Sequence, residues 1–282
     1  MTPDPAAATP FDHLDLNGQA VPYQVEGAGA ADDDRVLLAT DHDLTARAPW
    51  AAAGYAVLPG LPAPHHAALQ AGLAQLLRAA LRTAGCPVAD DFDITQYHRV
   101  VGDDPARHLA VIAQTKEFQH RQFPIPLPVL EAYLSAACGQ PVSAYNYHAD
   151  ERVFHLRIVR PGRADHNPLH RDVWLPEYRD GLNIYLPVAG STARSSLTLV
   201  SGSHHWPENA VERTAGGAVY HGVPYTVPGV LRPARPLHII RPNPGPAEVL
   251  VFSPYLLHGA AANLNEDATR ISLEMRFWKV VD

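Results

Sequence analysis

Histidine is frequent in this chain, and its spacing to acidic residues suggests a metal site. The 282 residues include 16 His, and histidine is the commonest metal ligand in proteins. On a strand, residues i and i+2 point to one face, so a His-x-Asp pair can offer two ligands to one ion. A third His from a distant strand would complete one face of an octahedron, and the three open positions suit non-haem Fe(II). The chain has three such pairs: His13 with Asp15, His148 with Asp150, and His170 with Asp172.

The surroundings of the three pairs differ. The first lies in a polar N-terminal arm and has no predicted strand around it, which indicates a solvated surface. The second, in Tyr147-His148-Ala149-Asp150-Glu151, fits a polar turn between two strands and stays open as an alternative metal pair. The third is followed by Val173-Trp174-Leu175, and a further histidine, His258, comes after a predicted buried strand and a turn. His170 and Asp172 are therefore the strongest candidates, because the downstream sequence completes a set that neither rival completes as well.

A strand with one polar face is predicted near the C-terminus. Its polar residues alternate with apolar ones, and the polar set is Arg270, Ser272, Glu274 and Arg276. Because buried polar groups without partners cost several kcal/mol, this face is either solvated or lines a cavity. In a cavity, the planar guanidinium of Arg270 can bind a carboxylate, with the hydroxyl of Ser272 beside it. The alternative is an exposed edge strand with alternating charges.

Helices are expected first along the chain and strands last. Apolar residues recur at helical spacing over residues 64–84, and shorter helices are expected over 105–113, behind the cap Asp104, and over 127–138, before Gly139. Many short strands without intervening helices then indicate a β-sandwich or a small jelly-roll barrel, with the helices packed outside. The predicted strands are 143–147, 153–159, 182–188, 196–200, 237–241, 248–252 and 270–278.

The chain is expected to form a single domain over residues 1–282, mainly β in an α+β arrangement. Residues 1–139 supply a polar arm and the helices, and residues 140–282 supply the β core. The Pro- and Gly-rich segment 207–236 is too long for a hairpin loop, so it is either a lid over a site or an insertion without a role there.

Several functions are disfavoured by features that the sequence lacks. It has no GxSxG, GxxxxGK[ST], HExxH or strand-borne GxGxxG motif, which argues against serine hydrolases, P-loop enzymes, zincins and Rossmann dehydrogenases. A net charge of −7 with dispersed arginines argues against a nucleic-acid partner. No apolar run approaches the roughly 20 residues that cross a membrane, and residues 1–10 show no secretory signal, which predicts a soluble cytoplasmic protein. Cys86 and Cys138 are expected to be buried free thiols.

The order of these motifs resembles a known enzyme family. His170-Arg171-Asp172, His258 and Arg270-Ile271-Ser272, in this order on a β core, are similar to the Fe(II)/2-oxoglutarate dioxygenases, and most of all to the phytanoyl-CoA dioxygenase-like branch. The resemblance covers roughly residues 140–282, and the N-terminal helices follow it more loosely. Its supporting segments are Arg160-Pro161-Gly162, Leu182-Asn183-Ile184-Tyr185-Leu186-Pro187-Val188 and Gly202-Ser203-His204-His205-Trp206-Pro207.

The resemblance implies a double-stranded β-helix of the jelly-roll or cupin-like kind. It implies that His170, Asp172 and His258 hold Fe(II), and that 2-oxoglutarate and O₂ are cosubstrates. The distal carboxylate of 2-oxoglutarate would then bind Arg270, with Ser272 beside it. An aspartate at position 172, where related halogenases carry a small residue, favours hydroxylation or a related oxidation.

Further polar residues are candidates for contacts with 2-oxoglutarate or the substrate. Asn183 and Tyr185 share a strand face and either contact 2-oxoglutarate or form hydrogen bonds within the barrel wall. Residues on the predicted strand 153–159 and after the metal pair either line a pocket or face solvent. The nominated substrate contacts are Trp174, Glu177, His155 and Arg157.

The predicted substrate is a small polar metabolite, as in a specialised biosynthetic pathway. No basic cluster or long apolar groove for an acyl-CoA is visible, and the carboxylates of Glu177 and Asp180 point to an amine-bearing compound. Two alternatives remain open: a cupin-like metal enzyme that does not use 2-oxoglutarate, and a β-sandwich binding module with a vestigial metal site. The sequence indicates no membrane partner and leaves the oligomeric state open.

Overall fold

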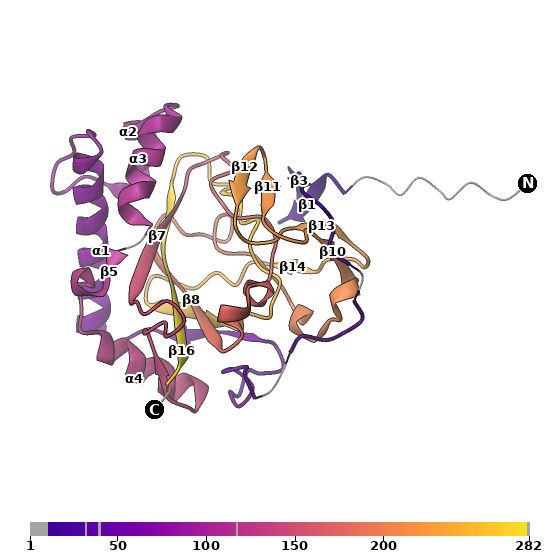
Figure 1. Ribbon diagram of the computed structural model, residues 1–282. Helices are drawn as coiled ribbons and strands as arrows, with labels where there is room; N and C mark the ends of the chain where they lie inside the picture. The colour runs from indigo at the N-terminus through magenta and orange to yellow at the C-terminus, as the bar shows by residue number, and fades with distance from the viewer. Residues whose placement is uncertain (1–10, 32, 39–40, 117, 281–282) are drawn as a thin grey trace, which may run out of the picture.

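A seven-stranded antiparallel sheet occupies the centre of the molecule (Figure 1). The computed structural model describes residues 11–31, 33–38, 41–116 and 118–280. Residues 1–10, where the sequence shows no secretory signal, lie outside the described part. The strand order is β4 (Tyr55–Pro59), β15 (Glu248–Phe252), β8 (Gly181–Ala189), β16 (Arg270–Lys279), β7 (Val153–Val159) and β5 (Phe118–Gln119), and β6 (Val142–Ser143) pairs with β16. This sheet-rich architecture with accompanying helices confirms the predicted class.

One face of the large sheet is covered by helices, which stand beside β7 and β5 in Figure 1. The helices are α1 (Ala63–Thr83), α2 (Tyr97–Val101), α3 (Pro105–Thr115) and α4 (Leu127–Cys138). Asp104 caps α3 as predicted, because its side chain accepts hydrogen bonds from two backbone N–H groups of the first turn. Gly139 ends α4 with a φ of 71°, which favours glycine. Apolar side chains of β16 such as Leu273 and Phe277 pack against this helical layer.

A short ladder of paired segments carries the predicted metal ligands. His170 pairs with His258, His258 pairs in turn with Leu199, and β9 (Leu199–Val200) pairs with β14 (Ile239–Ile240). Leu199 belongs to a buried cluster that also contains Tyr185 and Phe252 from the inner face of the large sheet. The ligands therefore lie on the side of the large sheet opposite the helices.

The N-terminal arm is more ordered than the sequence suggested. It forms β1 (His13–Leu16), β2 (Gln19–Pro22) and β3 (Val25–Glu26), so the prediction that no strand surrounds His13 was wrong. The turn between β1 and β2 is Asn17-Gly18, and both residues have positive φ, of 60° and 76°. Such an Asn-Gly pair is a strong hairpin signal, which the reading of the arm as merely polar missed.

The segment 207–236 forms small sheets rather than an irregular loop. Its strands are β10 (Val211–Arg213), β11 (Ala218–Tyr220), β12 (Val223–Tyr225) and β13 (Val230–Pro233). β11 pairs with β3 of the arm, and β10 pairs with β13. A buried cluster then joins the arm and this segment to Leu169 and Leu257, each of which precedes a predicted metal ligand.

Other predictions can be compared directly with the structure. The bounds of β7 and β15 are as predicted, whereas the predicted strand 143–147 is reduced to β6 and β4 was not predicted. Cys86 and Cys138 are buried free thiols, as expected. Within the described part of the chain, no helix is long and apolar enough to cross a membrane.

Candidate metal centre

Three buried side chains converge on one point. Nε2 of His170 lies 3.4 Å from Oδ1 of Asp172, and Nε2 of His258 lies 3.6 Å from Oδ2 of the same carboxylate. One ligand atom from each residue falls within 4.8 Å of the others, and all three residues are buried. Among the described residues this is the one group of three or more such side chains with that geometry. It contains the predicted pair and the predicted third histidine.

Backbone pairing fixes the positions of the two histidines. The N–H of His170 donates to the carbonyl of His258, and the N–H of His258 donates back, both at 2.9 Å. The two residues are therefore directly opposite each other, and their rings lie 4.3 Å apart between centroids. After His170 the chain turns, because the N–H of Asp172 donates to the carbonyl of Pro254 at 3.1 Å. This turn places the carboxylate between the two imidazoles.

The hydrogen bonds of the two imidazoles leave Nε2 free for a metal. Nδ1 of His170 lies 2.7 Å from the carbonyl oxygen of Pro168, and Nδ1 of His258 lies 2.9 Å from that of Leu256. A carbonyl can only accept, so each Nδ1 carries a proton, and Nε2 is the nitrogen of each ring that can offer a lone pair to a metal. Burial, with the neighbouring His170, also lowers the pKa of His258 to about 4. His258 is therefore a neutral imidazole at neutral pH, as a metal ligand must be.

The carboxylate of Asp172 is held by two residues that lie opposite each other on adjacent strands of the large sheet. Asn183 on β8 and Arg276 on β16 are cross-strand partners. Nδ2 of Asn183 donates to Oδ2 of Asp172 at 2.7 Å, while Nη2 of Arg276 lies 3.0 Å from Oδ1. Burial raises the pKa of Asp172, but the surrounding groups, with the positive charge of Arg276 foremost, lower it by more, so this pKa lies well below its ordinary value. Asp172 is thus ionised and fixed in orientation.

A cavity of about 40 Å³ extends from the two histidines along the inner face of the large sheet. Arg270 lies in its wall with 1% of its surface exposed, yet its Nε and Nη1 have no hydrogen-bond partner among the described residues. The buried hydroxyl of Ser272 also has no hydrogen-bond partner among the described residues. Buried polar groups are almost always paired, so these donors are available to a bound group.

The other nominated residues lie at varying distances from this cavity. Tyr185 is buried, and its ring lies 5.6 Å below the guanidinium of Arg270, while its hydroxyl bonds to Ser191. Arg157 lines the cavity, and His155 lies directly across from Glu274 on the neighbouring strand. Burial lowers the pKa of His155 to about 4. The roles of Tyr185, Arg157 and His155 stay predictions.

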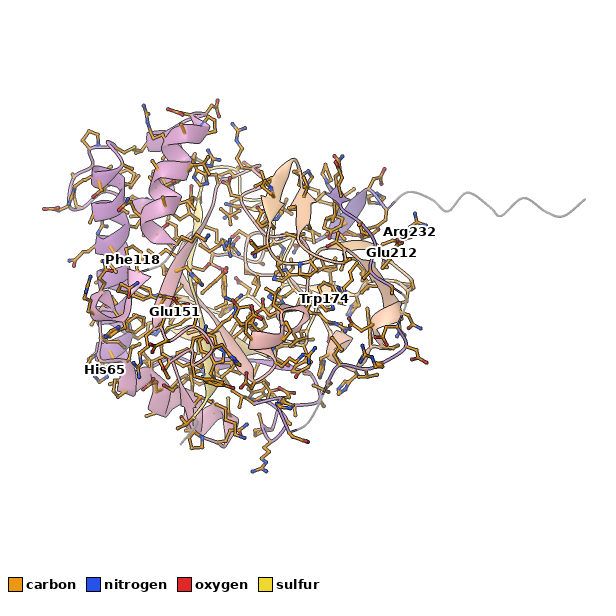
Figure 2. All side chains as sticks on the ribbon, in the orientation of Figure 1. His65, Phe118, Glu151, Trp174, Glu212 and Arg232 are labelled. Carbon is orange, nitrogen blue, oxygen red and sulfur yellow. The ribbon has the colours of Figure 1, made fainter. Side chains whose placement is uncertain are left out.

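Trp174 and Glu177 are not in the described lining of the cavity. The indole of Trp174 donates to Glu208 at 2.9 Å, within the cluster that joins the arm to segment 207–236. Figure 2 shows Trp174 in the middle of the molecule, well away from Phe118 on the helical side. The part of Trp174 and Glu177 in substrate binding likewise stays a prediction.

Within the part of the chain that the structure describes, the alternative metal pair belongs to no group of three possible ligands. His148 and Asp150 lie in a turn, as predicted, where Asn146 pairs with Glu151. Nε2 of His148 lies 3.4 Å from a carboxylate oxygen of Asp180, and the hydroxyl of Tyr147 donates to the other oxygen. Asp150 instead accepts a hydrogen bond from a tyrosine hydroxyl.

Sequence reasoning missed three contacts near the metal centre. Asn183 was nominated as a contact of 2-oxoglutarate, which stays a prediction, and its hydrogen bond to Asp172 was not foreseen. Arg276 was recognised as part of a polar face but not as the partner of Asp172. Asn167, whose Oδ1 accepts from Nη1 of Arg157 at 3.1 Å, was not singled out. The alternation of β16 already placed Arg276 on the face of Arg270, which was the signal available for the contact of Arg276 with Asp172.

No protein-family model and no curated protein matches this sequence. Among solved structures, the non-heme monooxygenase ThoJ in its apo form has a TM-score of 0.50 and 14% identity, covering 84% of this chain and 77% of ThoJ. The chain resembles ThoJ in fold. AviO1 from Streptomyces viridochromogenes Tue57 has a TM-score of 0.46 and 21% identity, covering 82% and 91% of the two chains. The epimerase SnoN, in complex with Fe3+, alpha ketoglutarate and nogalamycin RO, has a TM-score of 0.46 and 16% identity, covering 84% and 82%.

Proposed function

We propose that this protein is a non-haem Fe(II)- and 2-oxoglutarate-dependent oxygenase that oxidises a C–H bond of a small polar metabolite. The observation that carries the proposal is the guanidinium of Arg270, whose Nε and Nη1 lack partners among the described residues and which lines the same cavity as the two metal-facing histidines. A metal site alone does not require a buried arginine. A site for a metal and a bound dicarboxylate does.

The donor set fits Fe(II). Two imidazole nitrogens and one carboxylate oxygen on one side of an ion leave its other positions open, as in non-haem iron oxygenases. His170, Asp172 and His258 would hold the ion. Asn183 and Arg276 would keep the carboxylate of Asp172 in place, because both already donate to it.

The polar wall of β16 fits 2-oxoglutarate. Arg270 would bind its distal carboxylate through its guanidinium, of which Nε and Nη1 lack partners among the described residues, and Ser272 would donate a further hydrogen bond. The ring of Tyr185, which lies below the guanidinium of Arg270, would limit the movement of that guanidinium. When bound, Fe(II) and 2-oxoglutarate would activate O₂ for the oxidation of a C–H bond.

The chain itself would position these groups and exclude water. The buried cluster of Leu197, Leu199, Phe252 and Leu256 fills the space between the large sheet and the histidine ladder. We assign the two layers to a double-stranded β-helix, with the large sheet as one wall and the ladder through His170, His258 and β9 as the other. A dry interior would restrict the oxidant to the bound substrate.

Residues 207–236 would form a cover over one end of this site within a single domain. The N–H of Val230 donates to the carbonyl of Leu169 at 2.9 Å, directly before the ligand His170. The hydroxyl of Tyr23, from the arm, donates to the carbonyl of Val230 at 2.9 Å. These two bonds support a cover attached to the metal-binding segment.

Calorimetric titration of the protein with Fe(II) and then 2-oxoglutarate, without oxygen, tests this function. We expect one metal per chain and one 2-oxoglutarate whose affinity falls in an Arg270→Lys variant. Metal binding without 2-oxoglutarate binding would instead favour a cupin-like enzyme of another kind. A protein that binds neither would be a binding module with a vestigial site.

A further inference from the structure

Two further arginines line the cavity besides Arg270. Arg157 on β7 and Arg276 on β16 both line it, with 32% and 25% of their side-chain surface exposed. Arg270, by contrast, is 1% exposed. The cavity therefore has one buried cationic side chain and two that are partly exposed.

The accessible arginines are held in fixed orientations. Nε of Arg157 lies 3.1 Å from Oε2 of Glu274, and its Nη1 donates to Asn167 at 3.1 Å. The guanidinium of Arg276 lies 4.5 Å above the ring of Tyr178 and bonds to Asp172 through Nε and Nη2. Among the described residues, Nη2 of Arg157 and Nη1 of Arg276 make no hydrogen bond. Each arginine thus keeps one donor group available.

The charges around the cavity do not balance. Arg157, Arg270 and Arg276 face the carboxylates of Glu274 and Asp172. Burial raises the pKa of Glu274, but Arg157 and Arg270 bring it below its ordinary value, so it is ionised. A divalent metal ion would add two positive charges, and 2-oxoglutarate would remove two. One positive charge then remains, which disfavours a cation and favours an anion.

Metal binding would leave less negative charge to balance Arg276. Among the described residues, Asp172 is the one carboxylate that forms an ion pair with Arg276, at 3.0 Å. A metal ion bound to Asp172 would share that negative charge, and the guanidinium would lie close to a second cation. An oxyanion at the free Nη1 would restore the balance.

We propose that the substrate carries an oxyanion, a carboxylate or a phosphate, which binds the free donors of Arg157 and Arg276 in the wall of the cavity. This rests on the proposed function, in which 2-oxoglutarate already occupies Arg270. It replaces the expectation of an amine, which relied on Glu177 and Asp180. Asp180 bonds to Tyr147 and His148, and neither carboxylate is in the described lining of the cavity.

The test measures binding of small fluorinated probes by ¹⁹F NMR line broadening, with Ni(II) and 2-oxoglutarate present. The probes are 4,4,4-trifluorobutyrate, 3,3,3-trifluoropropylphosphonate and 4,4,4-trifluorobutylammonium, which have similar size and differ in charged group. We expect both anions to bind more tightly than the cation. The tighter anion distinguishes a carboxylate substrate from a phosphate substrate.

Variants locate the binding. Arg157→Gln should weaken binding of the preferred anion about tenfold or more, because a charged hydrogen bond is lost. The matched control is Arg232→Gln, since Arg232 is exposed on β13 opposite Glu212, far from the helices in Figure 2. It should bind the anion as the unaltered protein does. Equal losses in both variants, no loss in Arg157→Gln, or tighter binding of the ammonium probe would overturn the proposal.

Failure of the proposed function is a separate result. If 2-oxoglutarate does not bind to the metal-loaded protein, the oxygenase assignment fails whatever the probes do. If 2-oxoglutarate binds and the anionic probes do not, the oxygenase assignment stands and the oxyanion substrate is excluded.

Discussion

Arg171 and Glu208 form a buried ion pair beside the metal-binding segment, with Nη1 2.5 Å from Oε1. Arg171 stands between two metal ligands in the sequence and is 1% exposed. Its Nη2 donates to the carbonyl of Ser203 at 2.7 Å, while the Ser203 hydroxyl accepts from the N–H of Leu257, the residue before His258, at 2.8 Å. Ser203 therefore connects both metal-binding segments, and Arg171 anchors one of them to it.

Replacing Arg171 should destabilise the fold strongly. An Arg171→Met variant leaves a buried carboxylate without its main partner, which typically costs about 3–5 kcal/mol. Adding Glu208→Met should recover part of this loss. Urea unfolding measures the change. Arg82→Met, which removes an exposed pair with Asp90, is the control and should change little. An equal loss in Arg82→Met would contradict the role of the buried pair.

Asn183 should matter for metal affinity more than for folding. Asn183→Ala removes a donor that orients the carboxylate of Asp172, and loss of such a partner typically weakens metal binding by about 10- to 100-fold. Titration with Fe(II) under nitrogen measures the change. Asn265→Ala removes a comparable bond to a backbone carbonyl away from the ligands and should leave metal affinity unchanged. If both variants bound metal like the parent, Asn183 would have no role in the metal centre.

The shape of the Arg270 side chain should determine cosubstrate affinity. Arg270→Lys keeps the charge but removes the two-pronged donor, so 2-oxoglutarate should bind about 10- to 150-fold more weakly, corresponding to about 1.5–3 kcal/mol. Iron affinity should not change, because Arg270 is not a ligand. Calorimetry measures both affinities. Unchanged 2-oxoglutarate affinity would mean that another residue, such as Arg276, binds its carboxylate.

Buried histidines should make the metal-free protein less stable in mild acid. Burial lowers the pKa of His166 to about 3 and that of His204 to about 4. In the unfolded chain each has a pKa of about 6.5, so between pH 6.5 and 4 the unfolded state binds protons that the folded state does not. Their contribution to stability is therefore present above pH 6.5 and lost as the pH falls.

Urea unfolding at pH 7 and pH 5 checks this sign. The free energy of unfolding should be lower at pH 5, and His166→Gln should reduce the difference between the two pH values. His13→Gln, at an exposed position, should leave the difference as it is. A metal-free protein that is more stable at pH 5 than at pH 7 would contradict the account.

Local patterns predicted part of this structure well. The strands β7 and β15 have the predicted bounds, because alternation and continuous apolar runs are properties of the segment itself. The strand β4 was missed, since its five residues become a strand by pairing with β15. The approach of His170 to His258 also depends on pairing between distant segments, and the family resemblance rather than periodicity indicated it.

The contacts that side chains make across the interior of the protein were harder to predict. The sequence placed Arg276 and Arg270 on one face of a strand, but it could not tell which would be paired and which would be left unpaired. That difference arises because Arg276 lies opposite Asn183 on β8, where both reach Asp172. The unpaired atoms of Arg270, which carry the proposed function, are visible only in three dimensions.

Formation of succinate from 2-oxoglutarate with added Fe(II) and O₂, without a substrate, tests the central claim most directly. The unaltered protein should form succinate slowly and only with Fe(II), His170→Ala should reduce the rate to background, and His148→Ala should keep it. Mass spectrometry of succinate measures all three rates. No Fe(II)-dependent succinate from the unaltered protein, or a loss in His148→Ala equal to that in His170→Ala, would contradict the assignment of this site.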